Sequence, residues 1–279
     1  MKKLLLLFVL TAGSLNFAAL PKSIEIQSGK IFVRLAAEKC WNINGVKWDS
    51  NMMGIDAPKS HYGMAFQPQG SRFFIGSGHG ESGKSEELVS LKIKVDGKEI
   101  TPVQGNLISG KTIDVVKTSY IADFIVNYSF RIANDRLDEK IVIRAKNLVK
   151  VNFLYCFMHP WSTRFTDFLL METDGSFKVL KFKSDGNSPA RKKFPAGAWY
   201  DPKSGLAVVT VTRFEKGERN AFREVWDRSM YRKDYLVPYS RAYFRVDNEL
   251  RASASTAFFC EKDADKWQKT AKEIAEKLK

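Results

Sequence analysis

Alternating apolar and polar residues mark the middle of the chain as a series of β-strands. Over residues 124–132 apolar side chains occupy every second position, and over residues 137–146 they do so except at Glu139. This is the period of a strand that buries one of its two faces. Asn134-Asp135-Arg136 separates the two runs with residues that are typical of a turn. The pattern therefore predicts two consecutive antiparallel strands.

A third run, residues 149–158, is apolar on both faces and leads into His159, Pro160 and Trp161. Strands of this kind are buried on both sides. Because proline has no N–H to donate to a ladder, we expect strand pairing to stop here. His159 and Trp161 would then lie at the tip of a central strand.

Turn dipeptides divide much of the remaining chain into hairpins, because Asp-Gly and similar pairs adopt the tight turns that join antiparallel strands. The predicted hairpins are residues 22–27 with 30–35, 89–95 with 98–103, and 168–173 with 177–182. Further strands are predicted at residues 40–48 with a turn at Asn44-Gly45, at 206–212, at 239–246 and at 252–259.

Three segments differ from this pattern. Residues 49–83 form a long stretch rich in Gly, Pro and aromatic residues, which predicts a binding loop. Residues 213–234 mix charges of both signs with aromatic residues and are compatible with a helix or an irregular excursion. At residues 267–278 apolar side chains recur at helical spacing. The predicted fold is all-β: a large antiparallel β-sandwich with a C-terminal amphipathic α-helix, forming one domain over residues 20–279.

The N-terminus has the layout of a secretory signal peptide. Lys2 and Lys3 precede an unbroken apolar run over residues 4–10, and small residues follow. The run is too short to span a bilayer as a helix. We therefore expect residues 1–19 to be a signal peptide, the protein to be periplasmic or extracellular, and no transmembrane segment to be present.

The charge of the chain points to anionic partners. The formal net charge is +14, and removing Lys2 and Lys3 leaves 14 − 2 = +12. Such an excess attracts nucleic acid, anionic membranes or acidic polysaccharides. Export favours a polysaccharide or cell-envelope partner and argues against nucleic acid. A generally basic, soluble surface explains the same charge equally well.

The three cysteines, Cys40, Cys156 and Cys260, have long spacings that match no metal site. They allow one disulfide at most, and buried thiols are the simpler interpretation.

Residues 78–85 match the spelling of a phosphate-binding loop, G-x-x-x-x-G-K-[ST]. That loop requires a helix directly after its lysine, Lys84. Here an alternating strand follows instead, so nucleotide binding is only a remote third hypothesis.

The chain contains three histidines, His61, His79 and His159, and each lies in a turn-rich or strand-end position. Each one alone is explained by a local hydrogen bond that holds a loop, whereas together they suggest a shared cleft. An imidazole can transfer protons or bind a metal ion. The composition allows a three-histidine zinc site, but no close ligand spacing supports it. We predict no metal ion and no cofactor.

Residues 123–161 resemble the galactose mutarotase-like supersandwich: an alternating strand, a turn, a second strand ending at Asn147, and an aromatic strand closing on a histidine. The resemblance implies that His159 donates a proton to a sugar ring oxygen. It also implies a sugar-binding arginine and an earlier histidine, which Arg72 and His79 match in order. A late carboxylate base is implied as well, and the three candidates are Glu224, Glu249 and Glu261.

The sequence thus predicts an exported carbohydrate-active or carbohydrate-binding protein that acts on an acidic glycan or its fragments. The predicted catalytic residues are His159 and His79, and the predicted substrate-binding residues are Arg72, His61 and Trp161. A sugar epimerase or a polysaccharide lyase-like enzyme would use His159. The alternative is a non-catalytic envelope or glycan-recognition protein on the same fold. A late carboxylate close to His159 would favour catalysis, and the lack of one would favour binding.

Overall fold

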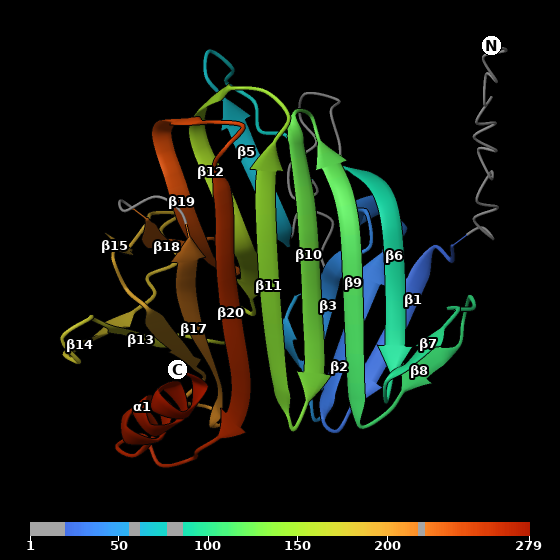
Figure 1. Cartoon of the computed structure of the whole chain (residues 1–279). Helices are drawn as coiled ribbons and strands as arrows, with labels where there is room; N and C mark the ends of the chain where they lie inside the picture. The colour runs from blue at the N-terminus through green and yellow to red at the C-terminus, as the bar shows by residue number, and fades with distance from the viewer. Residues whose placement is uncertain (1–19, 56–61, 77–85, 217–220) are drawn as a thin grey trace, which may run out of the picture.

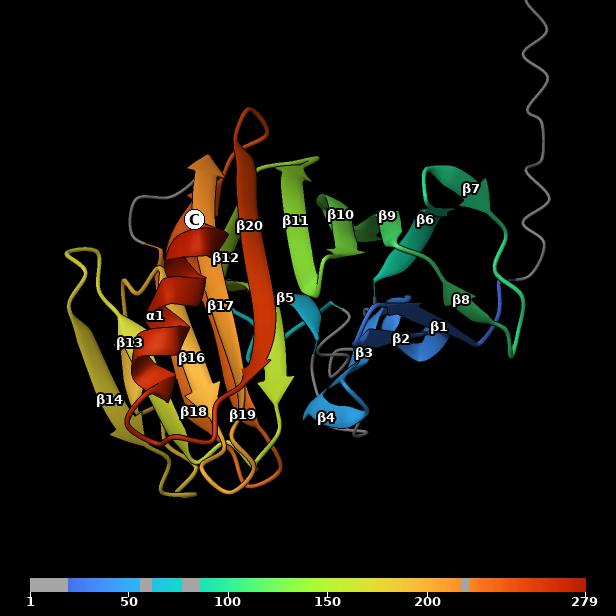
Figure 2. The ribbon, with the colours of Figure 1, turned by 90° about the horizontal axis from the view of Figure 1, so that it is seen from below.

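The computed structural model describes residues 20–55, 62–76, 86–216 and 221–279. Two ten-stranded sheets pack face to face, and one helix lies outside them (Figure 1). The view from below shows the two layers side by side, with the helix on the outer side of one of them (Figure 2). The predicted β-sandwich with a C-terminal helix is confirmed.

Sheet A contains the N-terminal strands and the strand that carries His159. Its neighbours are antiparallel except for the parallel pair β1 and β8. The order is β15 (Ala190–Lys192), β18 (Phe222–Asp227), β19 (Arg232–Phe244), β12 (Val149–Trp161), β4 (Asn51–Gly54), β3 (Asn42–Trp48), β2 (Ile31–Ala36), β1 (Ser23–Ser28) and β8 (Leu107–Ser109), with β5 (Gly63–Pro68) also paired to β12 and a short 3-10 turn, Ala37–Lys39, between β2 and β3.

Sheet B is antiparallel throughout and contains the predicted central strands. Its order is β14 (Phe177–Lys181), β13 (Asp167–Met171), β16 (Ala196–Tyr200), β17 (Leu206–Lys216), β20 (Glu249–Cys260), β11 (Arg136–Ala145), β10 (Phe124–Ala133), β9 (Thr112–Ile121), β6 (Glu87–Val95) and β7 (Lys98–Ile100).

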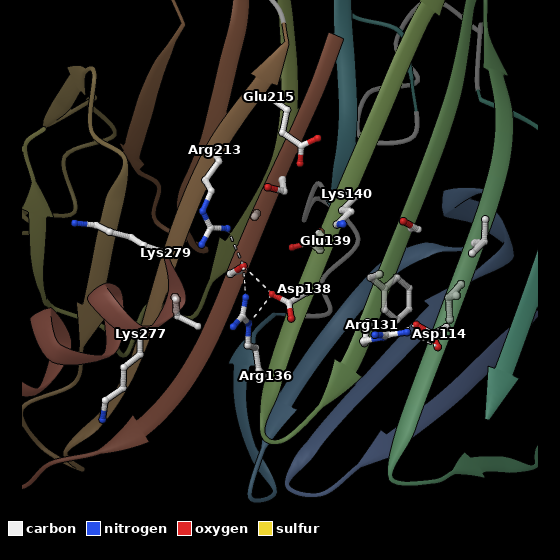
Figure 3. A pocket seen from close by; sticks show the side chains of 18 residues that line it. Asp114, Arg131, Arg136, Asp138, Glu139, Lys140, Arg213, Glu215, Lys277 and Lys279 are labelled. Carbon is white, nitrogen blue, oxygen red and sulfur yellow. Dashed lines mark hydrogen bonds and ion pairs between the residues drawn. The ribbon is translucent and has the colours of Figure 1, made fainter. Parts of the chain in front are cut away.

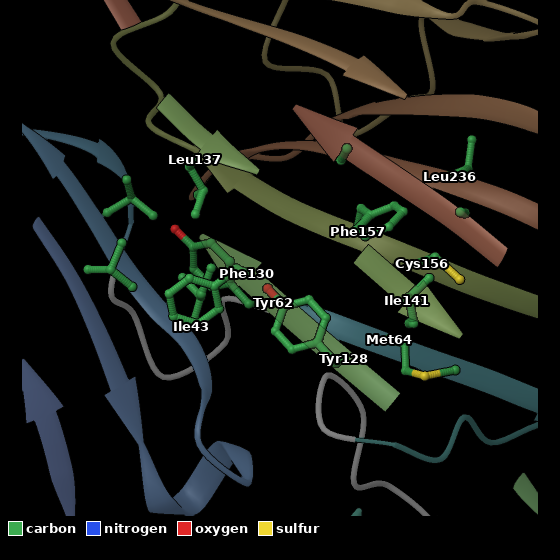
Figure 4. Close-up of a cluster of buried hydrophobic side chains, with 14 of the residues drawn as sticks. Ile43, Tyr62, Met64, Tyr128, Phe130, Leu137, Ile141, Cys156, Phe157 and Leu236 are labelled. Atoms are coloured by element: carbon green, nitrogen blue, oxygen red, sulfur yellow. The ribbon is translucent and has the colours of Figure 1, made fainter. Parts of the chain in front are cut away.

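The period-two pattern of β9, β10 and β11 sorts their side chains between solvent and core. Arg131 and Asp138 lie on the outer face of sheet B (Figure 3). Phe130 and Leu137, one position away, are buried between the sheets (Figure 4). One continuous hydrophobic core draws on both sheets. Burial of this apolar surface is the main force that holds the two layers together.

Positive φ angles explain two of the predicted hairpin turns. Asn134 and Asp135, between β10 and β11, have φ of 52° and 54°. Asp96 and Gly97, between β6 and β7, have φ of 50° and 83°. Two consecutive residues with positive φ form the turn whose twist matches that of a hairpin, and Asn, Asp and Gly tolerate it best.

Asn44-Gly45 is not a turn, which corrects the prediction. Strand β3 runs through both residues, and its pairing with β2 shifts so that Arg34 faces Gly45 while Leu35 faces Ile43. Asn44 is the extra residue of a β-bulge, a position where a neighbouring glycine is common.

Two segments that lacked clear alternation also form strands. Residues 213–234 contain the end of β17, all of β18 and the start of β19, so the expected helix or irregular excursion is wrong. The first eight residues of β19 are buried on both faces, which removes the polar half of the pattern. Likewise, residues 49–83 contain β4 and β5 rather than one continuous loop.

Strand β12 continues through Pro160, contrary to the expectation that it ends at His159. Trp161 pairs with Arg232 on one side and with Gly54 on the other. The carbonyl oxygen of Pro160 accepts a hydrogen bond of 2.9 Å from the backbone N–H of Ile55. The missing proline donor is thus tolerated because the residue still contributes as an acceptor.

The predicted helix is α1, Trp267–Leu278, which packs on the outer face of sheet B. Trp267 stacks on Tyr200 of β16 with a centroid separation of 4.6 Å. Within the described part of the chain, no helix has the length and apolar character needed to cross a membrane. All three cysteines are free thiols, with Cys40 and Cys156 buried and Cys260 exposed.

Candidate functional site

His159 lies in the interior of the sandwich and is only 2% exposed. Its Nε2 lies 2.6 Å from Oε2 of Glu139, and the hydroxyl of Tyr128 donates to the other carboxylate oxygen at 2.7 Å. The imidazole ring also packs on Trp161 at 5.0 Å. His159 therefore connects β12 of sheet A to β11 of sheet B.

A second buried ion pair lies beside His159. Asp234 is directly opposite His159 in the pairing of β12 with β19. Its Oδ1 lies 3.1 Å from Nε of Arg223. Nη2 of the same arginine donates a hydrogen bond to the carbonyl oxygen of Thr210 in sheet B. Burial raises the pKa of Asp234, and the charges of Arg223 and His159 oppose that rise.

A third buried polar cluster surrounds the ammonium group of Lys117. It donates to Oε1 of Glu86 at 2.6 Å, to the Asn42 side chain at 2.7 Å and to the carbonyl oxygen of Cys40 at 3.0 Å. Ser119 donates to the same Glu86 oxygen. All three ammonium protons thus have acceptors, which is the arrangement that a buried lysine requires. We assign these three interior clusters to the stability of the sandwich.

A different cluster lies on the outer face of sheet A, which we call the Glu224 face. Because Arg223 and Asp234 point into the sandwich, their strand neighbours Glu224 and Tyr235 point out of it. Aromatic rings, one carboxylate and two cations meet there. The Glu224 face consists of Phe74, Phe153, Tyr155, Arg191, Phe222, Glu224, Trp226, Lys233 and Tyr235.

Direct contacts join the polar groups of the Glu224 face. The carboxylate of Glu224 is 5% exposed and lies 4.0 Å from Nε of Arg191. Tyr155 and Tyr235 have ring centroids 4.7 Å apart, and the indole N–H of Trp226 donates to the Tyr235 hydroxyl at 2.5 Å. The Lys233 ammonium lies 5.0 Å from the centre of the Tyr235 ring.

Both phenols of this face stay protonated at neutral pH. Burial raises the pKa of Tyr155 to about 12, and the negative charge of Glu224 adds to the effect. The same two causes hold the pKa of Tyr235 well above its ordinary value. A carboxylate acceptor therefore stands beside two hydroxyl groups that can donate hydrogen bonds.

The late carboxylates do not share a face with His159. Glu224 is opposite Tyr235, whereas His159 is opposite Asp234, so Glu224 and His159 lie on opposite faces of sheet A. Glu249 forms ion pairs with Arg144 and Arg251 in sheet B. Glu261 follows the end of β20, where its carbonyl oxygen accepts a hydrogen bond from Tyr200. As folded, the carboxylate that meets His159 is Glu139.

The other predicted site residues are dispersed. Trp161 is buried and packs against Trp199, so its ring is part of the core around His159. Arg72 is exposed, with its guanidinium 4.9 Å from the centre of the Phe73 ring. Phe74, two residues further along the chain, stacks on Tyr155 of the Glu224 face at 5.0 Å. The catalytic and binding roles of these residues stay predictions.

His61, His79 and the phosphate-loop spelling at 78–85 lie outside the described residues. Over the ranges that the structure describes, no three His, Cys, Asp or Glu side chains come together as metal ligands.

Tyr155, Lys233, Tyr235 and Arg191 were not predicted from the sequence. The available signal was Phe222-x-Glu224-x-Trp226, in which every second residue is aromatic or acidic. It indicates one face of a strand, but only once residues 222–227 are assigned as a strand.

No protein-family model matches the chain, and no curated protein sequence matches it. Solved structures do match, at identities that establish the fold alone. The Slr1438 protein of Synechocystis sp. PCC 6803 has a TM-score of 0.50 at 10% identity, over 86% of this chain and 96% of that chain. The YeaD protein of Salmonella typhimurium, described as a candidate mutarotase, has a TM-score of 0.52 at 9% identity, over 86% and 90%.

The GH36 α-galactosidase AgaA of Geobacillus stearothermophilus has a TM-score of 0.52 at 9% identity, and the match covers 86% of this chain but only 41% of that larger one. A two-sheet sandwich of this size and topology is therefore shared with sugar-acting proteins. The chain has the galactose mutarotase-like fold, as a divergent example of it.

Proposed function

We propose that this protein binds a carbohydrate on the Glu224 face. The observation that carries the proposal is one buried carboxylate, Glu224, beside Arg191 and among aromatic rings, one of which, Tyr235, also contacts Lys233. Sugars are recognised by aromatic surfaces that cover their C–H faces and by a few polar groups that bind their hydroxyls. The fold is compatible with this role because sugar-acting proteins share it.

The ligand that suits this face is an acidic sugar or a short acidic glycan. Arg191 and Lys233 provide positive charge for a carboxylate or sulfate group, and Glu224 accepts hydrogen bonds from ring hydroxyls. The signal-peptide pattern of residues 1–19 and the net charge of +14 support an exported protein that meets such glycans in the periplasm or outside the cell.

Two activities are compatible with this face. In an epimerase, Glu224 would take a proton from a sugar hydroxyl while a neighbouring phenol donates one. In a recognition protein, the same groups would bind the sugar without proton transfer. Sheet A separates Glu224 from His159, so an epimerase on this face would use a phenol, and not His159, as its acid.

Ligand-observed NMR with neutral and acidic mono- and oligosaccharides tests the proposal. We expect Glu224→Gln and Tyr235→Phe each to weaken binding by about tenfold, the cost of a lost hydrogen bond to a charged group. Glu99→Gln, a change at an exposed carboxylate of β7, should leave binding unchanged. Anomer exchange of a bound reducing sugar distinguishes the epimerase from the recognition protein. Sugar binding that survives Glu224→Gln in a correctly folded variant contradicts the proposal.

A further inference from the structure

The outer face of sheet B carries a hollow that is separate from the Glu224 face. Strands β9, β10, β11, β20 and β17 form its floor, and the last turn of α1 borders it (Figure 3). Its volume is about 690 Å³, within the range of ligand pockets in proteins. We call it the outer trough. It and the Glu224 face lie on opposite sides of the molecule, because each occupies the outer face of a different sheet.

Two guanidinium groups converge on one hydroxyl in the outer trough. Arg136 donates to Oγ of Ser255 at 2.9 Å, and Arg213 approaches the same oxygen at 3.4 Å. Ser255 in turn donates to Asp138 at 2.7 Å, and Arg136 pairs with that carboxylate at 2.6 Å (Figure 3). The carboxylate of Asp138 thus pairs directly with Arg136 and is linked to Arg213 only through Ser255. The two arginines and one carboxylate together keep an excess positive charge.

Other lysine side chains also line the outer trough. Lys140 follows Asp138 on the same face of β11 and is exposed. Lys277, at the end of α1, lines the margin of the outer trough. Among the described residues, no carboxylate lies within ion-pair distance of Arg213, Lys140 or Lys277. Glu215 is the single acidic lining residue that is not already paired and that faces outward.

The chemistry of the outer trough matches an oxyanion rather than a neutral sugar. Its outward side chains are mostly charged groups and serine hydroxyls, with Val116 as an exposed apolar residue. An uncharged sugar would find no outward aromatic ring to stack on. Each guanidinium, in contrast, can bind two oxygens of a sulfate or carboxylate through its fork of N–H donors. The extended, open shape suits a polymer that carries such groups at intervals.

We propose that the outer trough is a second glycan site, which binds the sulfate or carboxylate groups of an acidic polysaccharide through Arg213, Arg136 and Lys140. This site acts independently of the Glu224 face. A long glycan could engage both surfaces in turn, and each surface would add to the apparent affinity.

Calorimetric titration of the full chain tests this site, with dextran sulfate, polygalacturonate and uncharged dextran as probes. We expect both acidic polymers to bind and uncharged dextran not to bind, with the ratio of the two acidic affinities telling sulfate from carboxylate preference. Arg213→Gln combined with Lys140→Gln should weaken binding by at least about tenfold, because charge-assisted hydrogen bonds are lost.

A matched double variant, Lys178→Gln with Lys181→Gln on β14, removes the same charge from two exposed positions outside the trough. It should change the affinity by less than about twofold, since distant surface charges are screened. Arg213→Lys keeps the charge but loses the fork, so an intermediate loss is expected. Equal losses in both double variants, or equal binding of uncharged dextran, would overturn the proposal. Glu224→Gln removes only the contribution of the Glu224 face, so the loss caused by Arg213→Gln with Lys140→Gln should be the same with and without Glu224→Gln, which separates this site from the Glu224 face.

Discussion

Nε2 of His159 lies 2.6 Å from Oε2 of Glu139, and this contact joins the two sheets in the middle of the sandwich. Both side chains are almost completely buried. Removing one partner of a buried pair leaves the other without compensation in a medium that solvates charge poorly. The contact therefore ties His159, one of the two histidines predicted to be catalytic, to the stability of the fold.

We expect His159→Ala to lower the free energy of unfolding by about 3 kcal/mol, the typical cost of leaving a buried charge unpaired. Urea unfolding of the single variants and of His159→Ala with Glu139→Leu measures the coupling between the two side chains. The double variant should lose less than the sum of the single losses. Lys266→Ala, which removes the exposed pair with Asp263, is the control and should lower the free energy of unfolding far less than His159→Ala.

Gly205 should be much less replaceable than Gly175, another glycine with positive φ. It has a φ of +79°, and a Cβ there would lie 2.8 Å from the carbonyl oxygen of Glu261. Gly175 has a similar φ of +84° but open space around it. We expect Gly175→Ala to cost about 1 kcal/mol from backbone strain alone. Gly205→Ala should cost clearly more, and equal shifts of the two unfolding midpoints would contradict this.

The raised pKa of Tyr155 predicts a loss of stability at alkaline pH. Its folded pKa of about 12 exceeds the ordinary value of 10.0. The folded state therefore holds this proton more tightly than the unfolded state, so the contribution is fully present below pH 10 and disappears between pH 10 and 12. We expect Tyr155→Phe to flatten the decline of unfolding free energy over that interval, with the phenolate absorbance of both proteins measured in parallel. An unchanged decline would mean that Tyr155 does not cause it.

Thiol reactivity should distinguish the three cysteines. Cys260 is exposed, whereas Cys40 and Cys156 are buried, and burial raises the pKa of Cys40 to about 12 and that of Cys156 further above its ordinary range. Because the thiolate is the reactive form, one thiol per chain should react quickly with an aromatic disulfide reagent at neutral pH. Cys260→Ser should abolish the fast phase, while Cys40→Ser should leave it intact.

Much of the fold could be predicted from local pattern. The meander of β9, β10 and β11 follows from strict alternation and from turns such as Asn134-Asp135. Helix α1 follows from its apolar spacing. Strand β18 and the first part of β19 were missed because that part of β19 is buried on both faces and the alternation disappears. Asn44-Gly45 was misassigned because the same dipeptide fits a turn and a bulge.

The candidate site was only partly predictable. Glu224 was one of three late carboxylates, and the sequence contained no reason to prefer it. Tyr155 and Tyr235 are far apart in the chain, and only the pairing of β12 with β19 brings their rings together. His159 was correctly placed on a central strand, but the face on which it lies depends on two register shifts, one of them next to Phe157 with its φ of 50°.

The sequence by itself determined the class of the protein: alternating strands, tight turns and one terminal helix, with a strongly basic composition. The strands, turns and helix depend on residues that are close together in the sequence, so the sequence pattern alone predicts them. Only the tertiary structure decided that His159 faces Glu139 inside the sandwich and that Glu224 faces outward with Tyr235. Side-chain direction in a strand reverses with every residue, so a single bulge reassigns a residue from one face to the other.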